Sequence, residues 1–231
     1  MTTEPRVLPE SLQPVPVPGW LDQVRDALTD TAGEGSDGQG SAITDVSFAA
    51  LHAWHAGPVA DLIAETAARH GTDMAPHEAV RALHARAATG EPVDEATWSA
   101  ALEPALREIY RLAYPRARVH ERSASAAASF ARSRGWTDAE ADRYGETYAA
   151  LNTEVSDRVH AEANAIANAA AYARAFAAGD PKAYAEAWPY ALVRAWVAAC
   201  AGSADPDGPA AQEARNRLRD GLTDAVRRTS A

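Results

Sequence analysis

Apolar residues recur every three or four positions along most of this chain, the spacing that places them on one face of an α-helix. No segment alternates apolar and polar residues in the manner of a half-buried strand. Glycine and proline residues divide the pattern into segments. We therefore expect an all-α fold, a multi-helix bundle with helices at about 19–31, 44–56, 58–71, 76–89, 95–114, 116–134, 138–178, 181–201 and 210–228.

The longest of these helices begins at a capping box, in which the side chains of Thr137 and Glu140 bond to each other's backbone N–H groups. No stop signal follows before Gly179, so we expect one α-helix of roughly 40 residues, about 60 Å long. Its apolar stripe is expected at Tyr144, Tyr148, Leu151, Val155, Val159, Ala163, Ile166 and Ala170. We expect the core of the protein to contain Trp54, Trp98, Trp188, Trp196, Tyr148 and Leu151.

Alanine makes up 57 of the 231 residues. It is the strongest helix former, because its side chain loses no entropy in a helix, and its small size lets helix axes approach closely. Residues 1–18 differ, because their five prolines favour an extended chain. The sequence GEGSDGQGS at 33–41 is typical of a flexible linker. We therefore expect a Pro-rich N-terminal segment with a short helix and this linker, 1–42, followed by a single helical domain, 43–231.

Composition argues against several classes of protein. No uninterrupted run of about 18 large apolar residues is present, so we expect no transmembrane helix and no membrane partner. The acidic, Pro-rich start of the chain is unlike a secretory signal, and the single Cys200 excludes an intrachain disulfide framework. Arg outnumbers Lys 21 to one, as in GC-rich bacterial coding sequences. We expect a bacterial, cytoplasmic protein.

The net charge of −10 lies entirely in the first hundred residues, which hold 15 acidic and 5 basic side chains. The remainder is balanced, with 17 of each, and its segment 107–134 is basic. The candidate anion- or partner-binding residues there are Arg107, Arg111, Arg116, Arg118 and Arg122. Two interpretations stay open: the acidic half packs near this segment and the other charges are solvated, or the segment binds an anionic partner. Nucleic acid is not expected, because the overall charge repels phosphates.

Two groups of residues are candidates for binding a metal ion. His52 and His55 lie three residues apart and so share one helical face. Asp157 and His160 repeat this spacing, which is half of the carboxylate–histidine arrangement of di-iron bundles. The other half is missing from the sequence. We therefore expect no resident cofactor, and keep a divalent metal at His52, His55, Asp157 and His160 as the alternative.

No catalytic motif was found among the serines, glycines or Cys200. His70, His77 and His84 are expected near helix ends, where histidine is common. Asn152, Asn164 and Asn168 either cross-link helices by hydrogen bonds or face solvent, and the sequence does not decide between these.

We therefore expect a non-enzymatic protein-interaction module, such as an adaptor, regulator or immunity-type protein. Its expected partner is a protein of basic charge, matching the acidic first half of the chain, and a homodimer is compatible with the long apolar stripe. The alternative function is a metal- or small-molecule-dependent helical enzyme that uses histidine and carboxylate groups on the bundle helices.

Overall fold

All regular structure is helical in the residues that the computed structural model describes, which are 19–29, 46–202 and 208–229, with 116 and 154–160 described by backbone alone. The elements are α1 (Trp20–Thr29), α2 (Phe48–Trp54), the π-helix η2 (His55–Val59), α3 (Ala60–His70), α4 (Ala75–Ala88), α5 (Glu95–Ala113), α6 (Arg116–Ser133), α7 (Asp138–Asp157), the π-helix η3 (Arg158–Ala163), α8 (Asn164–Ala178), α9 (Pro181–Glu186), α10 (Pro189–Ala201) and α11 (Pro209–Thr229). The all-α prediction is confirmed. In these ranges no helix has both the length and the apolar character needed to cross a membrane. The predicted extended segment and the linker lie outside the described residues.

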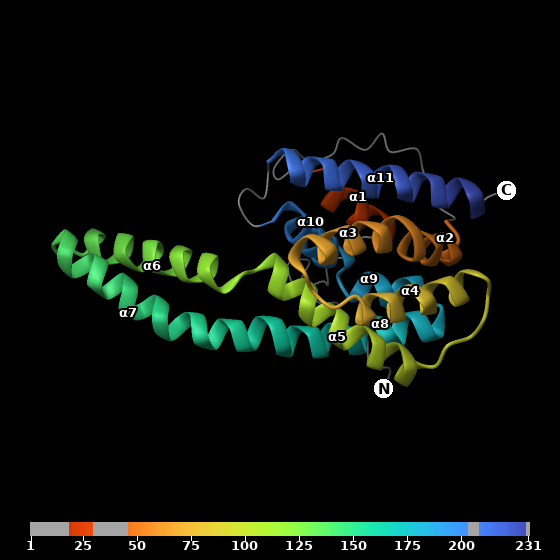
Figure 1. Ribbon diagram of the computed structural model, residues 1–231, viewed down its shortest axis with the longest axis horizontal. Helices are drawn as coiled ribbons and strands as arrows, with labels where there is room; N and C mark the ends of the chain where they lie inside the picture. The colour runs from red at the N-terminus through yellow and green to blue at the C-terminus, as the bar shows by residue number, and fades with distance from the viewer. Residues whose placement is uncertain (1–18, 30–45, 203–207, 230–231) are drawn as a thin grey trace, which may run out of the picture.

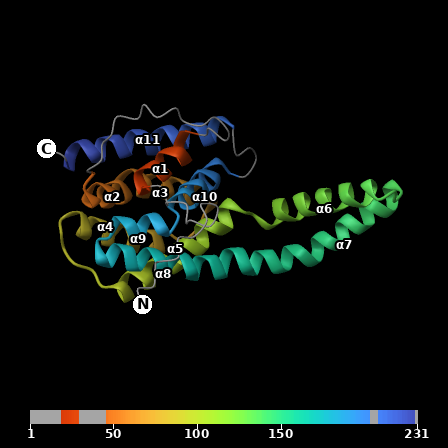
Figure 2. The same ribbon diagram turned by 180° about the vertical axis from the view of Figure 1, so that it is seen from behind.

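The helices form two parts of unequal shape (Figures 1 and 2). α1–α5 and α8–α11 pack together into a bundle, and α6 and α7 project from it side by side. We call this projecting pair, residues 116–157, the arm. The chain leaves the bundle at Pro115, where α5 has ended, and returns through α7 and η3 into α8. The two helices of the arm pack mainly against each other.

The bundle core is built around buried aromatic rings. Trp54 and Trp98 are fully buried and Trp196 nearly so, which confirms these three predicted core residues. The indole Nε1 of Trp54 donates a hydrogen bond to the carbonyl of Leu218, 2.9 Å away, and so joins α2 to α11. A buried indole that keeps a partner for its N–H avoids the cost of an unpaired polar group.

Trp188 was predicted in the core and is instead 51% exposed. It precedes α10 in the left-handed conformation, with φ 60°, so the chain turns between α9 and α10. The sequence pattern assumed one helix continuing through Pro189. Because a proline ring clashes with the preceding helical turn, the helix breaks there and the indole is carried out of the helical register.

The helix predicted to end at Gly57 continues instead through η2 into α3. Pro58 lies inside η2 and has no N–H to donate. An α-helix is usually broken by such a residue, whereas the wider π turn accommodates the missing hydrogen bond and the ring. His55 is the first residue of η2, so this local irregularity helps to set its position in the core.

The seam of the arm is made of small side chains. Ala128 and Ala131 of α6 and Ala141 and Ala149 of α7 are buried in it. A Cβ placed on Gly145 would lie 2.5 Å from the carbonyl oxygen of Ala124, so the two backbones are in direct contact there. Such an approach is open only to glycine.

Close packing of small residues turns the larger side chains of α7 outward. Tyr148 is 46% exposed and Leu151 is 69% exposed, so their predicted places in the core are wrong. The single α-helix of about 40 residues is also wrong. The π-helix η3 separates α7, with 20 residues, from α8, with 15, and the longest α-helix in the described residues is α11, with 21.

Candidate functional site

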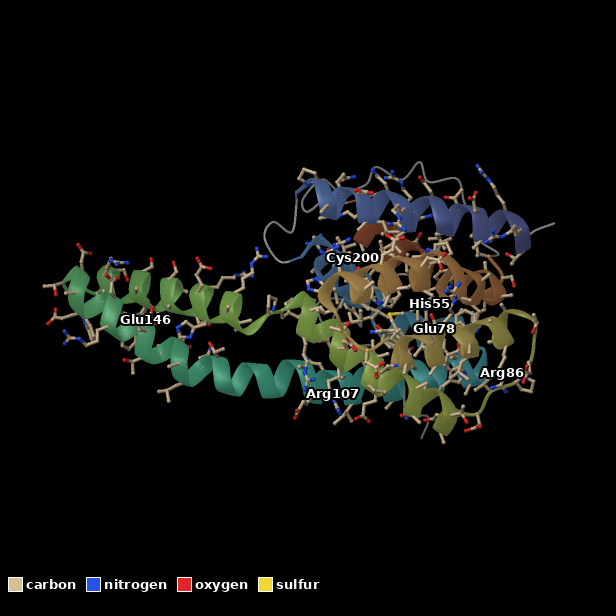
Figure 3. The ribbon with its side chains drawn as sticks, in the orientation of Figure 1. His55, Glu78, Arg86, Arg107, Glu146 and Cys200 are labelled. Carbon is tan, nitrogen blue, oxygen red and sulfur yellow. The ribbon has the colours of Figure 1, made fainter. Side chains whose placement is uncertain are left out.

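Three histidines meet in the core of the bundle: His52 on α2, His55 at the start of η2 and His84 on α4. The spacing of His52 and His55 brings both to one helical face. Helix α4 packs across α2 and η2 and adds His84, which sequence reasoning left as an unremarkable residue near a helix end. Figure 3 shows His55 directed into the interior of the bundle.

The imidazoles contact one another and the surrounding aromatic rings. The Nδ1 atoms of His52 and His84 are 2.9 Å apart, so one of these nitrogens donates its proton to the other. The ring centroids of His55 and His84 are 4.2 Å apart. The rings of Trp98 and Phe176 lie against His84, with centroid distances of 4.8 and 4.9 Å. Aromatic rings thus enclose part of the cluster.

Burial keeps the three histidines neutral. Loss of solvation lowers the pKa of His52 to about 4, and the same effect together with the nearby His52 lowers the pKa of His55 to about 3. The pKa of His84 is also held well below its ordinary value, by burial and then by the other two rings. Burial raises the pKa of Tyr184, whose hydroxyl therefore keeps its proton and faces His55 Nε2 at 3.4 Å.

A cavity of about 50 Å³ adjoins the cluster and is lined by His55, His77 and His84 among mainly apolar side chains. This volume has room for roughly three water molecules. His77 Nε2 lies 3.6 Å from Glu108 Oε2, and burial lowers the pKa of His77 against the opposing effect of that carboxylate. The Nε2 atoms of His77 and His84 have no hydrogen-bond partner among the described residues. One of the histidines that line this cavity thus also faces a carboxylate.

The predicted metal-binding residues fall in two places. His52 and His55 are in the cluster, whereas Asp157 ends α7 and His160 is in η3, and the side chains of these two lie outside the described residues. Within the described part of the chain, no group of three or more His, Cys, Asp or Glu side chains is arranged to hold a metal ion. Metal binding by this set stays a prediction.

The five predicted arginines lie near the junction of the bundle and the arm. Arg107 forms an ion pair with Glu103, one turn earlier on α5, and the side chain of Arg116 lies outside the described residues. Arg111, Arg118 and Arg122 form no ion pair with any described residue. Among the described residues, no Asp or Glu of the first hundred forms an ion pair with 107–134. The contact between the two is of the opposite sign, because the histidine His77 faces the carboxylate of Glu108.

The outer side of the arm carries a row of large side chains, of which sequence reasoning assigned Tyr148 and Leu151 to the core. The rings of Trp136 and Tyr144 have centroids 5.4 Å apart, and those of Tyr144 and Tyr148 are 6.1 Å apart. Leu151 follows Tyr144 by seven residues and so continues the same helical face. We call Trp136, Tyr144, Tyr148 and Leu151 the arm face.

The arm face, Arg118 and Arg122 thus belong to the projecting arm, whereas the histidine cluster is enclosed in the bundle. The lone Cys200 is also enclosed; Thr66 donates a hydrogen bond to its Sγ, and burial raises the pKa of its thiol. Its protonated, buried thiol is typical of a structural cysteine.

No family model, curated protein or solved structure matches this chain.

Proposed function

We propose that this protein is a helical interaction module, an adaptor, regulator or immunity-type protein, that docks a partner through the arm face. The observation that carries this proposal is the exposure of Trp136, Tyr148 and Leu151, at 49%, 46% and 69%. The seam of the arm uses none of them, because it is made of alanine and glycine. Contiguous exposed apolar groups are typical of binding surfaces, and aromatic residues carry much of the energy of protein interfaces.

The charge of the helix that carries the arm face narrows the class of partner. α7 holds six acidic side chains and one basic side chain, and Arg132 of α6 pairs with two of the acids, Asp138 and Asp142. A basic protein surface with an exposed apolar strip is complementary to this acidic excess, and opposite charges at an interface speed association. Arg111 and Arg118, near the bundle end of the arm, stay candidates for an anionic partner.

The first experiment changes the arm face without touching the seam. The double variant Tyr148→Ser/Leu151→Ser is expected to weaken capture of a basic partner at least tenfold, by roughly 1.4 kcal/mol or more. Unfolding stability should stay within about 0.5 kcal/mol of the parent, because both side chains are solvent-exposed. Affinity capture from native lysate at low salt, followed by direct titration of the purified partner, measures this.

Ile166→Ser is the matched control, because Ile166 is also an exposed apolar residue, at 52%, but it lies on α8 outside the arm. It should leave capture unchanged. Equal capture by the parent and the double variant contradicts the proposal. An acidic partner bound through the arm face, or a dimer in light scattering that the double variant abolishes, contradicts the basic occupant proposed here.

One observation favours the alternative function, a metal- or small-molecule-dependent enzyme. His77, which lines the cavity, also faces Glu108, and this is the histidine–carboxylate pairing used in proton transfer. The small size of the cavity supports at most a ligand of a few atoms. Elemental analysis of untagged protein tests the metal-dependent form, and a content well below one metal ion per chain contradicts it.

A further inference from the structure

A second, larger pocket lies where the arm joins the bundle. Its volume is about 540 Å³, and its walls include Tyr110, Tyr114, Arg122, Asn152 and Asn168. Pockets that hold small metabolites commonly measure about 300–1,000 Å³. We call this the arm-base pocket. It is separate from the histidine cavity, with which it shares no lining residue among those described.

The π-helix η3 brings the asparagines of this pocket into line. Asn152 precedes Asn164 by 164 − 152 = 12 positions, which in a regular α-helix turns the two side chains about 120° apart. A π segment takes up one additional residue, so the effective separation becomes about eleven positions and the angle falls to about 20°. Asn168 follows Asn164 by one further turn. All three therefore line one pocket.

The hydrogen bonds in the pocket direct hydroxyl protons toward a ligand. The Nδ2 of Asn168 donates to the hydroxyl oxygen of Tyr110 at 2.6 Å, and the Nδ2 of Asn152 donates to the hydroxyl oxygen of Ser123 at 3.3 Å. Each hydroxyl oxygen is thus an acceptor within the protein, and its own O–H remains a donor for another group. Burial raises the pKa of Tyr110, so its phenol keeps this proton at neutral pH.

The charge of the pocket is positive. Arg122 lines it and has no ion-pair partner among the described residues, and no Asp or Glu is found among the described residues of its wall. A guanidinium group binds a carboxylate or phosphate through two parallel hydrogen bonds. The half-exposed ring of Tyr114, at 48%, with Val119 and Ala191, gives the same pocket an apolar side.

We propose that the arm-base pocket binds a small organic anion, a phosphate or carboxylate attached to a ring. Arg122 holds the oxyanion, Ser123 and Tyr110 donate hydrogen bonds to it, and the ring lies against Tyr114. Three features of the pocket match this class of ligand: hydroxyl donors that lack an acceptor within the protein, a positive charge and an apolar wall. The same features disfavour a cation or a purely apolar molecule.

Three matched pairs of compounds test this class with the full chain: AMP and adenosine, glucose 6-phosphate and glucose, and benzoate and benzyl alcohol. Isothermal titration at low salt is expected to show saturable binding of at least one anion, and binding of its uncharged partner at least about tenfold weaker. The first two pairs report phosphate recognition and the third reports carboxylate recognition. If no anion binds saturably, or if the uncharged partners bind equally well, the proposal is wrong.

Two arginine variants locate the binding. Arg122→Gln is expected to weaken the anion at least about tenfold, because it removes the charge inside the pocket. Arg118→Gln is the control, since Arg118 lies one turn earlier on α6 and does not line this pocket. Both side chains reach solvent, so both variants should keep the parent circular dichroism spectrum and unfolding midpoint. Equal loss in the two variants indicates general attraction to a basic surface and contradicts the site.

Tyr110→Phe tests independently whether the hydroxyl group of Tyr110 contributes to anion binding. It removes only the O–H, and it is expected to weaken the anion several-fold while leaving its uncharged partner unaffected. Asn168 loses its acceptor in this variant, so unfolding stability is measured alongside. Unchanged anion affinity in Tyr110→Phe contradicts the proposed role of this hydroxyl.

Discussion

Lowering the pH from about 7 to about 5 is expected to remove about 4 kcal/mol from the free energy of unfolding through His52 and His55 alone. In the folded protein the pKa of His52 is about 4 and that of His55 about 3, against 6.5 in the unfolded chain. Between these values the unfolded chain binds more protons than the folded one, so acid favours unfolding. Each histidine contributes about 2 kcal/mol over this range, and the effect is absent above about pH 7.

Urea unfolding over a series of pH values measures this loss. In His55→Phe the free energy of unfolding should fall by about 2 kcal/mol less over the same pH interval, because one buried histidine is absent. The slope is the readout, so a general loss of stability caused by the substitution does not obscure it. His70→Gln is the control, since His70 is exposed at the end of α3 and should leave the slope unchanged. An unchanged slope in His55→Phe shows that this imidazole is not held neutral by burial.

Gly221→Ala is expected to destabilise the bundle by about 2 kcal/mol. The added methyl group would lie 2.4 Å from both Cβ and Cγ of Pro58, where α11 crosses η2. The proline ring cannot rotate away, so the two helices must separate. Overpacking of this kind costs up to about 3 kcal/mol, and the better helix propensity of alanine returns about 1 kcal/mol.

Gly57→Ala is the matched control for this substitution. Gly57 is also a helical glycine, and a Cβ placed on it meets no atom within 4 Å beyond its two chain neighbours. This variant should stay within about 1 kcal/mol of the parent, because the better helix propensity of alanine is offset by the steric restriction on a residue that precedes proline. Thermal unfolding of the two variants checks the pair. Equal stability of the two variants shows that the crossing of α11 and η2 is looser than described here.

Sequence patterning located most helices but misread the buried face of residues 138–178. As far as Ala169, the buried positions that the structure describes there follow a four-residue step and are small: Ala141, Gly145, Ala149, Thr153, Ala161, Ala165 and Ala169. Choosing the stripe with the largest apolar residues selected Tyr148 and Leu151 instead. In a chain so rich in alanine, close approach of backbones replaces burial of large side chains, and hydrophobicity then points to the wrong face.

The candidate sites show which contacts sequence can reveal. The spacing of His52 and His55 predicted a shared face, because that relation is local. His84 contacts His52 across 32 residues of sequence, and the packing of α4 on α2 that brings them together has no local signal. The line of asparagines was also hidden, because regular helical geometry places Asn152 on a different face from Asn164, and only η3 corrects this.

The arm separates the residues that hold it together from the residues it presents. Its seam tolerates little beyond alanine and glycine, whereas its outer side makes no demand on folding. Mutations on the outer side therefore escape most selection for stability, and under the proposed docking function they would be selected by the partner that they bind. Among descendants of this chain, specificity can thus evolve quickly on the arm while the seam stays small, much as variable loops diverge on a constant scaffold.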